Sequence, residues 1–238
     1  MAVFFKDGCF KIDTENTTYS IKTVDFGFLM HEYYGGKITD TDLGYIYPRT
    51  TNRSYITVPY NDTENVFRPL EIGHEYAPFG GGDFRTAALR VKMGDGSRVA
   101  DLRYRSHEIL NTAATIPGMP CAAANGQDGI QTLVITLKDD ATELYVKLYY
   151  VVFEKFDVIA RHAEIINKTS EDIYLEKAAS VQLDFLNSDY DFITLSGGWA
   201  RERHMQRTAI HNGTQGFCAR RGTTSHQSSA FFALCEKN

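Results

Sequence analysis

The stretch that combines the most reactive side chains is LSGGWARERHMQR, residues 195–207, which holds the chain's only tryptophan with three arginines and a histidine. Such a set fits three roles: a nucleic-acid patch, a catalytic loop, or a cationic corner that supports the fold. The chain carries 25 basic and 30 acidic residues, for a net charge of −5. Because proteins that bind phosphate backbones are normally basic, the composition argues against nucleic acid as the main partner.

Inside this stretch the residue order favours a structural role. Glu202 stands between Arg201 and Arg203, which predicts short-range pairing of charges, and the two glycines at 197–198 predict a sharp turn. We therefore predict that Trp199, Arg201 and Arg203 form a scaffold within the protein or between its domains, with direct contact to a ligand as the alternative.

Other candidate chemistry is weaker. PFGGGDF, residues 78–84, lacks the glycine spacing of a phosphate-binding loop and predicts a tight turn. Ser225 and His226 are adjacent, so their side chains point apart and do not predict a nucleophile–base pair. The seven histidines show no H-x-H or H-x-x-x-H pair, so no metal site is expected. No cofactor is expected either. Three carboxylates stand out as available for glycoside chemistry without informative spacing, namely Glu75, Asp83 and Asp101.

The elements that must position these residues follow a period of two. In TELYVKLYYVVFEKF, Leu144, Val146, Leu148 and Tyr150 point to one face of a predicted strand and the intervening residues to the other. Asp7–Gly8 and 94–96 (Gly-Asp-Gly) predict hairpins, the second joining ALRVKM to SRVADLRY. No long stretch fits a helical period, so we predict an all-β antiparallel sandwich. The polar, aromatic segment 39–82 is predicted to be a long ordered loop.

Five stretches, taken in order, resemble the amino-terminal domain of the glycoside hydrolase family 36 α-galactosidases. In that family they read roughly H-x-Y-W-G-K, Q-E-Y-P-x-Y-G-x-x-D-F-R, D-L-R-Y, G-x-W-x-R-E-R and R-G-x-S-S-H-Q. Here they are HEYYGGKI (31–38), HEYAPFGGGDFR (74–85), DGSRVADLRYRSHEI (95–109), YDFITLSGGWARERHMQR (190–207) and RRGTTSHQSSAFFAL (220–234). The order and spacing match over essentially the whole chain.

The resemblance implies an amino-terminal β-supersandwich over residues 1–238, followed in the family by a (β/α)₈ barrel and a small β-sheet domain. The family's barrel carries two aspartates that hydrolyse terminal α-galactosyl units of raffinose-type oligosaccharides with retention. Residues 1–238 are therefore expected to lack the catalytic residues and the last strands of the sandwich. Such a chain is expected to be inactive alone and to serve oligomerisation and active-site shaping, beside its own barrel and neighbouring subunits of a homotetramer.

The resemblance also implies substrate-binding residues in the loop 39–82, which in the family reaches a neighbour's active site. The family has an Asp-Arg pair shortly after Pro-Arg, and Asn52-Arg53 stand there. A second Asp-Arg, before an aromatic residue, is matched by Glu64-Asn65. An Asp and an Arg of the family pattern are thus Asn52 and Asn65, and an amide adds donors where a carboxylate only accepts.

Two other interpretations stay open. The changes at Asn52 and Asn65 keep an α-N-acetylgalactosaminidase possible, since that activity also occurs in the family. A stand-alone carbohydrate-binding module would use the aromatic residues of the loop to stack on sugars. A cytoplasmic location is expected, because no signal peptide is evident and the four cysteines show no disulfide or zinc pattern. No apolar run is long enough to span a membrane, and no membrane partner is expected.

Overall fold

A computed structural model describes residues 2–40, 42–46, 60–61, 66–67, 71–80, 83–121, 129–219 and 222–237. Its strands pair antiparallel, and the helical content of these residues is limited to short 3₁₀ turns, among them Asp25–Gly27, Gly44–Ile46 and Glu154–Phe156. The prediction of an all-β antiparallel fold is therefore confirmed. Within the described ranges no helix is long and apolar enough to cross a membrane.

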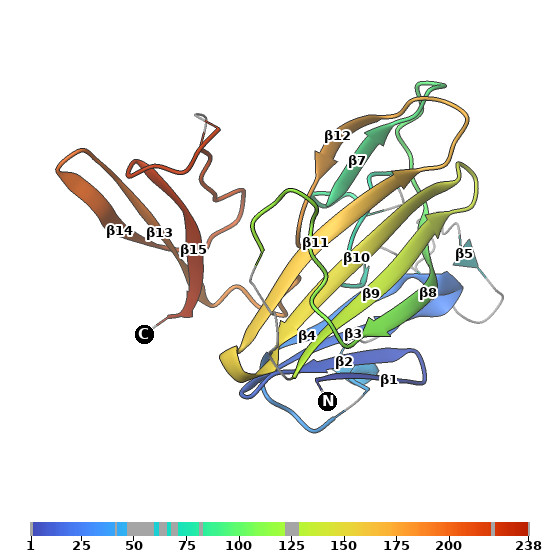
Figure 1. Ribbon diagram of the computed structural model, residues 1–238, viewed down its shortest axis with the longest axis horizontal. Coiled ribbons are helices and arrows are strands. Elements are labelled where there is room, and N and C mark those ends of the chain that lie inside the picture. The colour runs from blue at the N-terminus through green and yellow to red at the C-terminus, as the bar shows by residue number, and fades with distance from the viewer. Residues whose placement is uncertain are drawn as a thin grey trace. The chain divides into compact units, whose positions relative to one another are not determined.

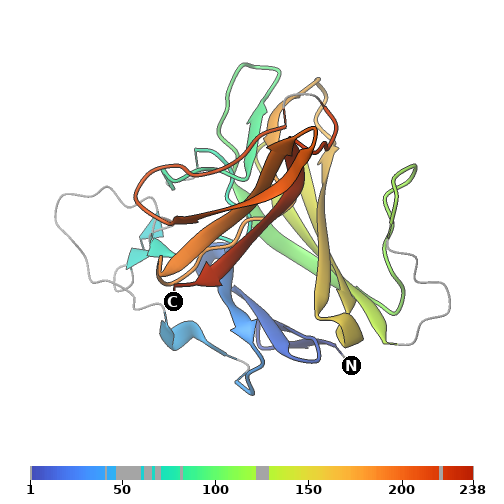
Figure 2. The same ribbon diagram turned by 90° about the vertical axis from the view of Figure 1, so that its left-hand side faces the viewer.

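The chain divides into two compact units, residues 1–184 and residues 185–238. The first unit contains two four-stranded sheets in which neighbouring strands also follow one another in the sequence (Figures 1 and 2). One sheet consists of β1 (Val3–Lys6), β2 (Cys9–Asp13), β3 (Thr17–Thr23) and β4 (Leu29–Gly36). The other consists of β8 (Leu102–Leu110), β9 (Ile130–Asp139), β10 (Leu144–Phe153) and β11 (Val158–Asn167).

Alternating apolar residues build the core between these sheets. On β10, Leu144, Val146, Leu148 and Tyr150 are all buried, as the two-residue period predicted, and Tyr145 and Lys147 are half-buried on the other face. They pack in one cluster with residues of the first sheet, among them Phe10, Ile12 and Ile21. The first unit is thus a β-sandwich with a continuous core.

The two Asp-Gly signals behave differently. Asp7 and Gly8, both at positive φ, form the turn of the β1–β2 hairpin as predicted. The predicted hairpin at 94–96 is wrong in its pairing. That segment does make a tight turn, but β7 (Leu89–Lys92) pairs with β12 (Tyr174–Ala178), and β8 pairs with β9.

Only parts of the long segment 39–82 are described. β5 (Tyr60–Asn61) pairs with β6 (Val66–Phe67), and residues 71–80 return to the first sheet. There His74 forms a bridge with Met30 at β4, so this end of the segment packs on the sandwich, as expected of an ordered excursion.

The second unit is one sheet in the order β14-β13-β15. Its strands are β13 (Tyr190–Gly198), β14 (Arg201–Ala209) and β15 (Ser228–Glu236). None of its described residues is buried, and every residue of β14 is exposed. A three-stranded sheet is stabilised when its hydrophobic face packs against another layer of secondary structure. This sheet is therefore expected to need such a second layer.

Candidate functional site

The most elaborate polar arrangement lies inside the sandwich of the first unit, around Glu75. Segment 73–75 runs beside β4, where His31 N donates to Gly73 O and Glu75 N donates to Leu29 O. This pairing brings the stretches HEYYGG and HEYAPFGGGDFR together at one point of the core. Glu75 is fully buried and His31 is 1% exposed.

Four side chains from four strands converge on the Glu75 carboxylate. Arg161 Nη2 of β11 lies 2.6 Å from Oε1, and Tyr150 Oη of β10 donates to the same oxygen at 2.7 Å. Tyr19 Oη of β3 donates at 2.7 and 2.9 Å, and His31 Nδ1 lies 3.2 Å from Oε2. We call these five residues the Glu75 cluster, and it connects both sheets of the sandwich.

The charges in the cluster stabilise one another. Burial by itself raises the pKa of Glu75, but Arg161 and the hydrogen bonds from His31 and Tyr150 outweigh it and hold the pKa below its ordinary value. For Arg161 burial works to lower the pKa, and Glu75 and the two phenols raise it instead. Burial and the nearby carboxylate raise the pKa of Tyr19 and Tyr150 well above the usual range. A carboxylate kept ionised by an arginine and closed off from solvent supports the fold and cannot reach a substrate.

The other two carboxylates that the sequence made available are also held by arginines. Arg85 makes a bidentate contact with Asp83, with Nη2 at 2.8 Å from Oδ2, and reaches Asp184 at 3.1 Å. Arg103 makes the corresponding contact with Asp101, with Nε at 2.7 Å.

At Asp83 and Asp184 the effect of burial on the pKa is opposed by Arg85 to different extents. It raises the pKa of both, but at Asp83 the contacts with Arg85 outweigh it and lower the pKa. At Asp184 burial wins over Arg85, and the pKa is raised although the ion pair is close. These carboxylates are thus parts of the scaffold and do not form an exposed acid/base pair.

The stretch 195–207 forms the β13–β14 hairpin of the second unit. Trp199 lies at its turn and is 92% exposed. The pairing of Glu202 with its flanking arginines was predicted wrongly, because in the described chain Glu202 Oε1 accepts from Ala200 N at 2.9 Å and makes no ion pair with Arg201 or Arg203. Neighbours in a strand point to opposite faces, which separates these side chains.

A bulge shapes this hairpin. The register shifts between Ser196 and Gly198, and Arg203 lies in the left-handed region with φ 55°. A Cβ on Gly197 would clash with the carbonyl oxygen of Arg201, so this position requires glycine. Arg207 is anchored, with Nε 2.6 Å from Asp191 Oδ2. The hairpin exposes the side chains of Trp199, Arg201 and Arg203.

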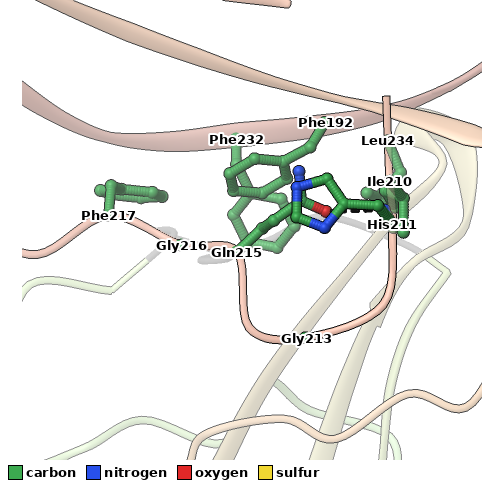
Figure 3. A pocket seen from close by; sticks show the side chains of 9 residues that line it. All are labelled: Phe192, Ile210, His211, Gly213, Gln215, Gly216, Phe217, Phe232 and Leu234. Carbon is green, nitrogen blue, oxygen red and sulfur yellow. Dashed lines mark hydrogen bonds between the residues drawn. The ribbon is translucent and has the colours of Figure 1, made fainter. Parts of the chain in front are cut away.

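Two pockets accompany these features. In the second unit a pocket of about 440 Å³ lies between loop 210–217 and the sheet (Figure 3). Its lining includes the rings of Phe192, Phe217 and Phe232. The side chain of Gln215, which also lines it, accepts a hydrogen bond from His211 N at 3.1 Å and donates one to Ala209 O at 3.0 Å. In the first unit a pocket of about 280 Å³ lies against Arg161 of the Glu75 cluster.

The remaining predictions have mixed outcomes. Ser225 Oγ accepts a hydrogen bond from Gln227 N. Among the described residues Ser225 and His226 make no hydrogen bond to each other, so they do not form a nucleophile–base pair. No group of three metal-ligating side chains occurs within the described ranges. The predicted substrate-binding residues Asn52, Arg53 and Asn65 lie outside the described residues. The Glu75 cluster was not predicted from the sequence. The signal for it was His31 in HEYYGGKI and Glu75 in HEYAPFGGGDFR, two titratable residues at fixed places in the motifs.

Comparison with known proteins places these features in a family context. A family model for the glycosyl hydrolase family 36 N-terminal domain matches residues 27–238. Alpha-galactosidase AgaA of Geobacillus stearothermophilus is 34% identical over 229 residues, which cover 96% of this chain and 31% of that protein. The bifunctional alpha-galactosidase/sucrose kinase AgaSK of Mediterraneibacter gnavus is 36% identical over 96% of this chain and 24% of its own length.

Solved structures agree with these relatives. The GH36 alpha-galactosidase AgaB of Geobacillus stearothermophilus superposes with a TM-score of 0.90 at 33% identity, covering 100% of this chain and 32% of that one. Variants of AgaA in complex with raffinose and with stachyose superpose with a TM-score of 0.89 at 35% identity, covering 97% of this chain and 32% of theirs. This chain thus spans about a third of the length of AgaA and AgaB.

Proposed function

Because the chain belongs to the glycosyl hydrolase family 36 N-terminal domain family, we propose that it is the amino-terminal β-supersandwich domain of an α-galactosidase. The observation that carries this proposal is the match of residues 27–238 to the family model, together with relatives that are alpha-galactosidases. The parent protein would hydrolyse terminal α-galactosyl units of oligosaccharides such as raffinose, which an AgaA variant binds.

The catalytic step is assigned to a part of the parent outside residues 1–238. A retaining glycosidase needs two carboxyl groups about 5 Å apart, one as nucleophile and one as acid/base. Glu75, Asp83 and Asp101 do not fit this role, because an arginine neutralises each of them. The proposal therefore places the catalytic aspartates in a (β/α)₈ barrel and predicts that residues 1–238 alone are inactive.

The second unit supports a role in assembly. Its sheet has no buried residue among those described, and it exposes Trp199, Arg201 and Arg203 at one hairpin. We assign this surface to contact with the rest of the parent chain, which would complete the supersandwich and hold it against the barrel. The loop with Asn52, Arg53 and Asn65 is proposed to reach the sugar in a neighbouring subunit of a homotetramer.

Two further parts of the proposal rest on single observations. The four cysteines are all free, which supports a reducing, cytoplasmic location. Asn52 and Asn65, where the family pattern has charged residues, favour an α-N-acetylgalactosaminidase as the second candidate function.

An assay of the full-length gene product tests these proposals. It should release p-nitrophenol from the α-galactoside much faster than from the α-N-acetylgalactosaminide, whereas the 238-residue protein releases none from either. The reverse preference would favour the second candidate. Turnover by the 238-residue protein would contradict the assignment of catalysis to the barrel, and tight galactoside binding without hydrolysis by the full-length product would favour a carbohydrate-binding module.

A further inference from the structure

The pocket beside Arg161 lies where edge strands of the two sheets in the first unit meet. Tyr34 comes from β4, the last strand of its sheet, and faces Tyr19 of β3 in register. Ile159 and Arg161 come from β11, the last strand of the other sheet. The segment after β12 supplies the remaining wall, with Ser180, Val181 and Leu183. All lining residues belong to one unit, so the pocket is a feature of the sandwich itself.

The cation in this pocket is already neutralised. Arg161 is 8% exposed at its side chain, and Glu75 lies 2.6 Å from its Nη2. Its Nη1 also donates to Tyr19 Oη at 2.8 Å, while Nε is buried without a hydrogen-bond partner among the described residues. Both terminal nitrogens of Arg161 are thus used inside the protein, and the buried carboxylate balances the guanidinium, so Arg161 gives the pocket no net positive charge. This arrangement favours a neutral polar ligand over an anion.

The other walls present one accessible aromatic ring, apolar side chains and two hydroxyl groups. The ring of Tyr34 is 39% exposed, and it lies 5.6 Å from the buried ring of Tyr19, which supports it from behind. Ile159, Val181 and Leu183 add apolar surface. The hydroxyl groups of Tyr34 and Ser180 make no hydrogen bond to any residue that the structure describes. Pockets for small ligands combine mostly apolar walls with a few polar groups in this way.

We propose that this pocket binds one neutral hexose unit. The apolar C–H face of a sugar ring packs on aromatic side chains, and its hydroxyls accept from and donate to groups such as those of Tyr34 and Ser180. The volume of about 280 Å³ lies near the lower limit of small-ligand pockets, which suits a single ring. The site does not depend on the proposed hydrolysis, because binding here needs no catalytic residue.

Titration calorimetry and ¹H–¹⁵N spectra of the folded 238-residue protein test this proposal. D-galactose and D-glucose serve as neutral probes, and D-galacturonate is the matched anion. We expect at least one neutral hexose to bind at millimolar concentration and to shift amides near 34, 159–161 and 180–183. Tyr34→Phe and Ser180→Ala should each weaken binding roughly 2- to 10-fold, the loss of one hydrogen bond.

A filling substitution locates the site. Val181→Trp should abolish binding, whereas Val158→Trp, at an exposed valine of β11 outside the pocket, should leave it unchanged. Near-UV circular dichroism and a cooperative melting transition establish that each variant is folded. Three results would overturn the proposal: no hexose binding by the folded wild type, tighter binding of galacturonate than of galactose, or binding that survives Val181→Trp.

Discussion

Replacing Arg161 by Met should destabilise the sandwich strongly, because it leaves Glu75 buried without its cation. The methionine keeps much of the length of the side chain, so the main loss is electrostatic. Glu75 retains hydrogen bonds from Tyr19, Tyr150 and His31, but none of these compensates for the missing charge. The substitution also removes the stacking of the guanidinium over Tyr150, at 4.5 Å.

The magnitude follows from the burial of both partners. Breaking a buried ion pair from one side costs about 3–5 kcal/mol, and the three remaining hydrogen bonds place Arg161→Met at about 3 kcal/mol. For a protein of this size about 1 kcal/mol lowers the melting temperature by about 2–4 °C, so we expect a drop of about 6–12 °C. Calorimetry and urea unfolding of the wild type and the variant at pH 7 measure it.

An exposed arginine gives the matched control. Arg98 lies 3.0 Å from Glu176 with half of its side chain exposed, and such a pair contributes about 0–1 kcal/mol. Arg98→Met should therefore change the melting temperature little. The double variant Arg161→Met/Glu75→Gln should be no less stable than Arg161→Met, because neither charge is then left alone. The reasoning is refuted when Arg161→Met melts no lower than Arg98→Met.

Three further predictions concern the hairpin and the carboxylates. Gly197→Ala should increase amide exchange throughout β13 and β14, because its Cβ meets a backbone carbonyl, whereas Gly198→Ala, with open space around it, should not; equal effects would contradict the clash. Arg203→Ala in the full-length enzyme should lower the melting temperature or tetramer yield more than it changes the kcat/KM ratio for two α-galactosides, and a pure change of that ratio would contradict the scaffold role. The pKa values of Glu75 and Asp83 are lower in the folded protein than in the unfolded chain, where they are about 4.3 and 3.9. The two ionised carboxylates therefore stabilise the folded state fully above these unfolded values. That contribution is lost as the pH falls through the lower folded values. Urea midpoints should therefore drop below about pH 4, and less steeply in Asp83→Asn; a midpoint that is flat in acid would show that neither carboxylate is stabilised by folding.

Local patterns predicted the strands well where one face is buried. Leu144, Val146 and Leu148 alternate with polar neighbours, and β10 has that register. The partner of β7 was not predictable from its turn, because the tight turn at 94–96 looks the same whether the next strand pairs with it or leaves the sheet. Distant pairing depends on the packing of whole sheets, which adjacent residues do not encode.

The Glu75 cluster shows the same limit at the level of single side chains. Sequence motifs placed His31 and Glu75 at fixed positions, but nothing near Arg161 in VIARHAEIIN distinguishes it from an arginine on a solvated strand. Its role comes from β11 lying across the core from β3, which only the assembled sandwich reveals. A charged residue on a predicted core face is the signal that such a partner exists.

The order of strands within the two sheets of the first unit has a consequence for the folding pathway. Each of these two four-stranded sheets joins strands that follow one another in the sequence. Apart from the connection 111–129 between β8 and β9, its pairings close short loops and can form early. The Glu75 cluster instead links distant parts of the chain, and the bond from Arg161 to Tyr19 spans 142 residues. Closing such long loops is entropically costly before the sheets dock. The cluster should therefore form after the folding transition state, so that its loss speeds unfolding and leaves the rate of folding almost unchanged.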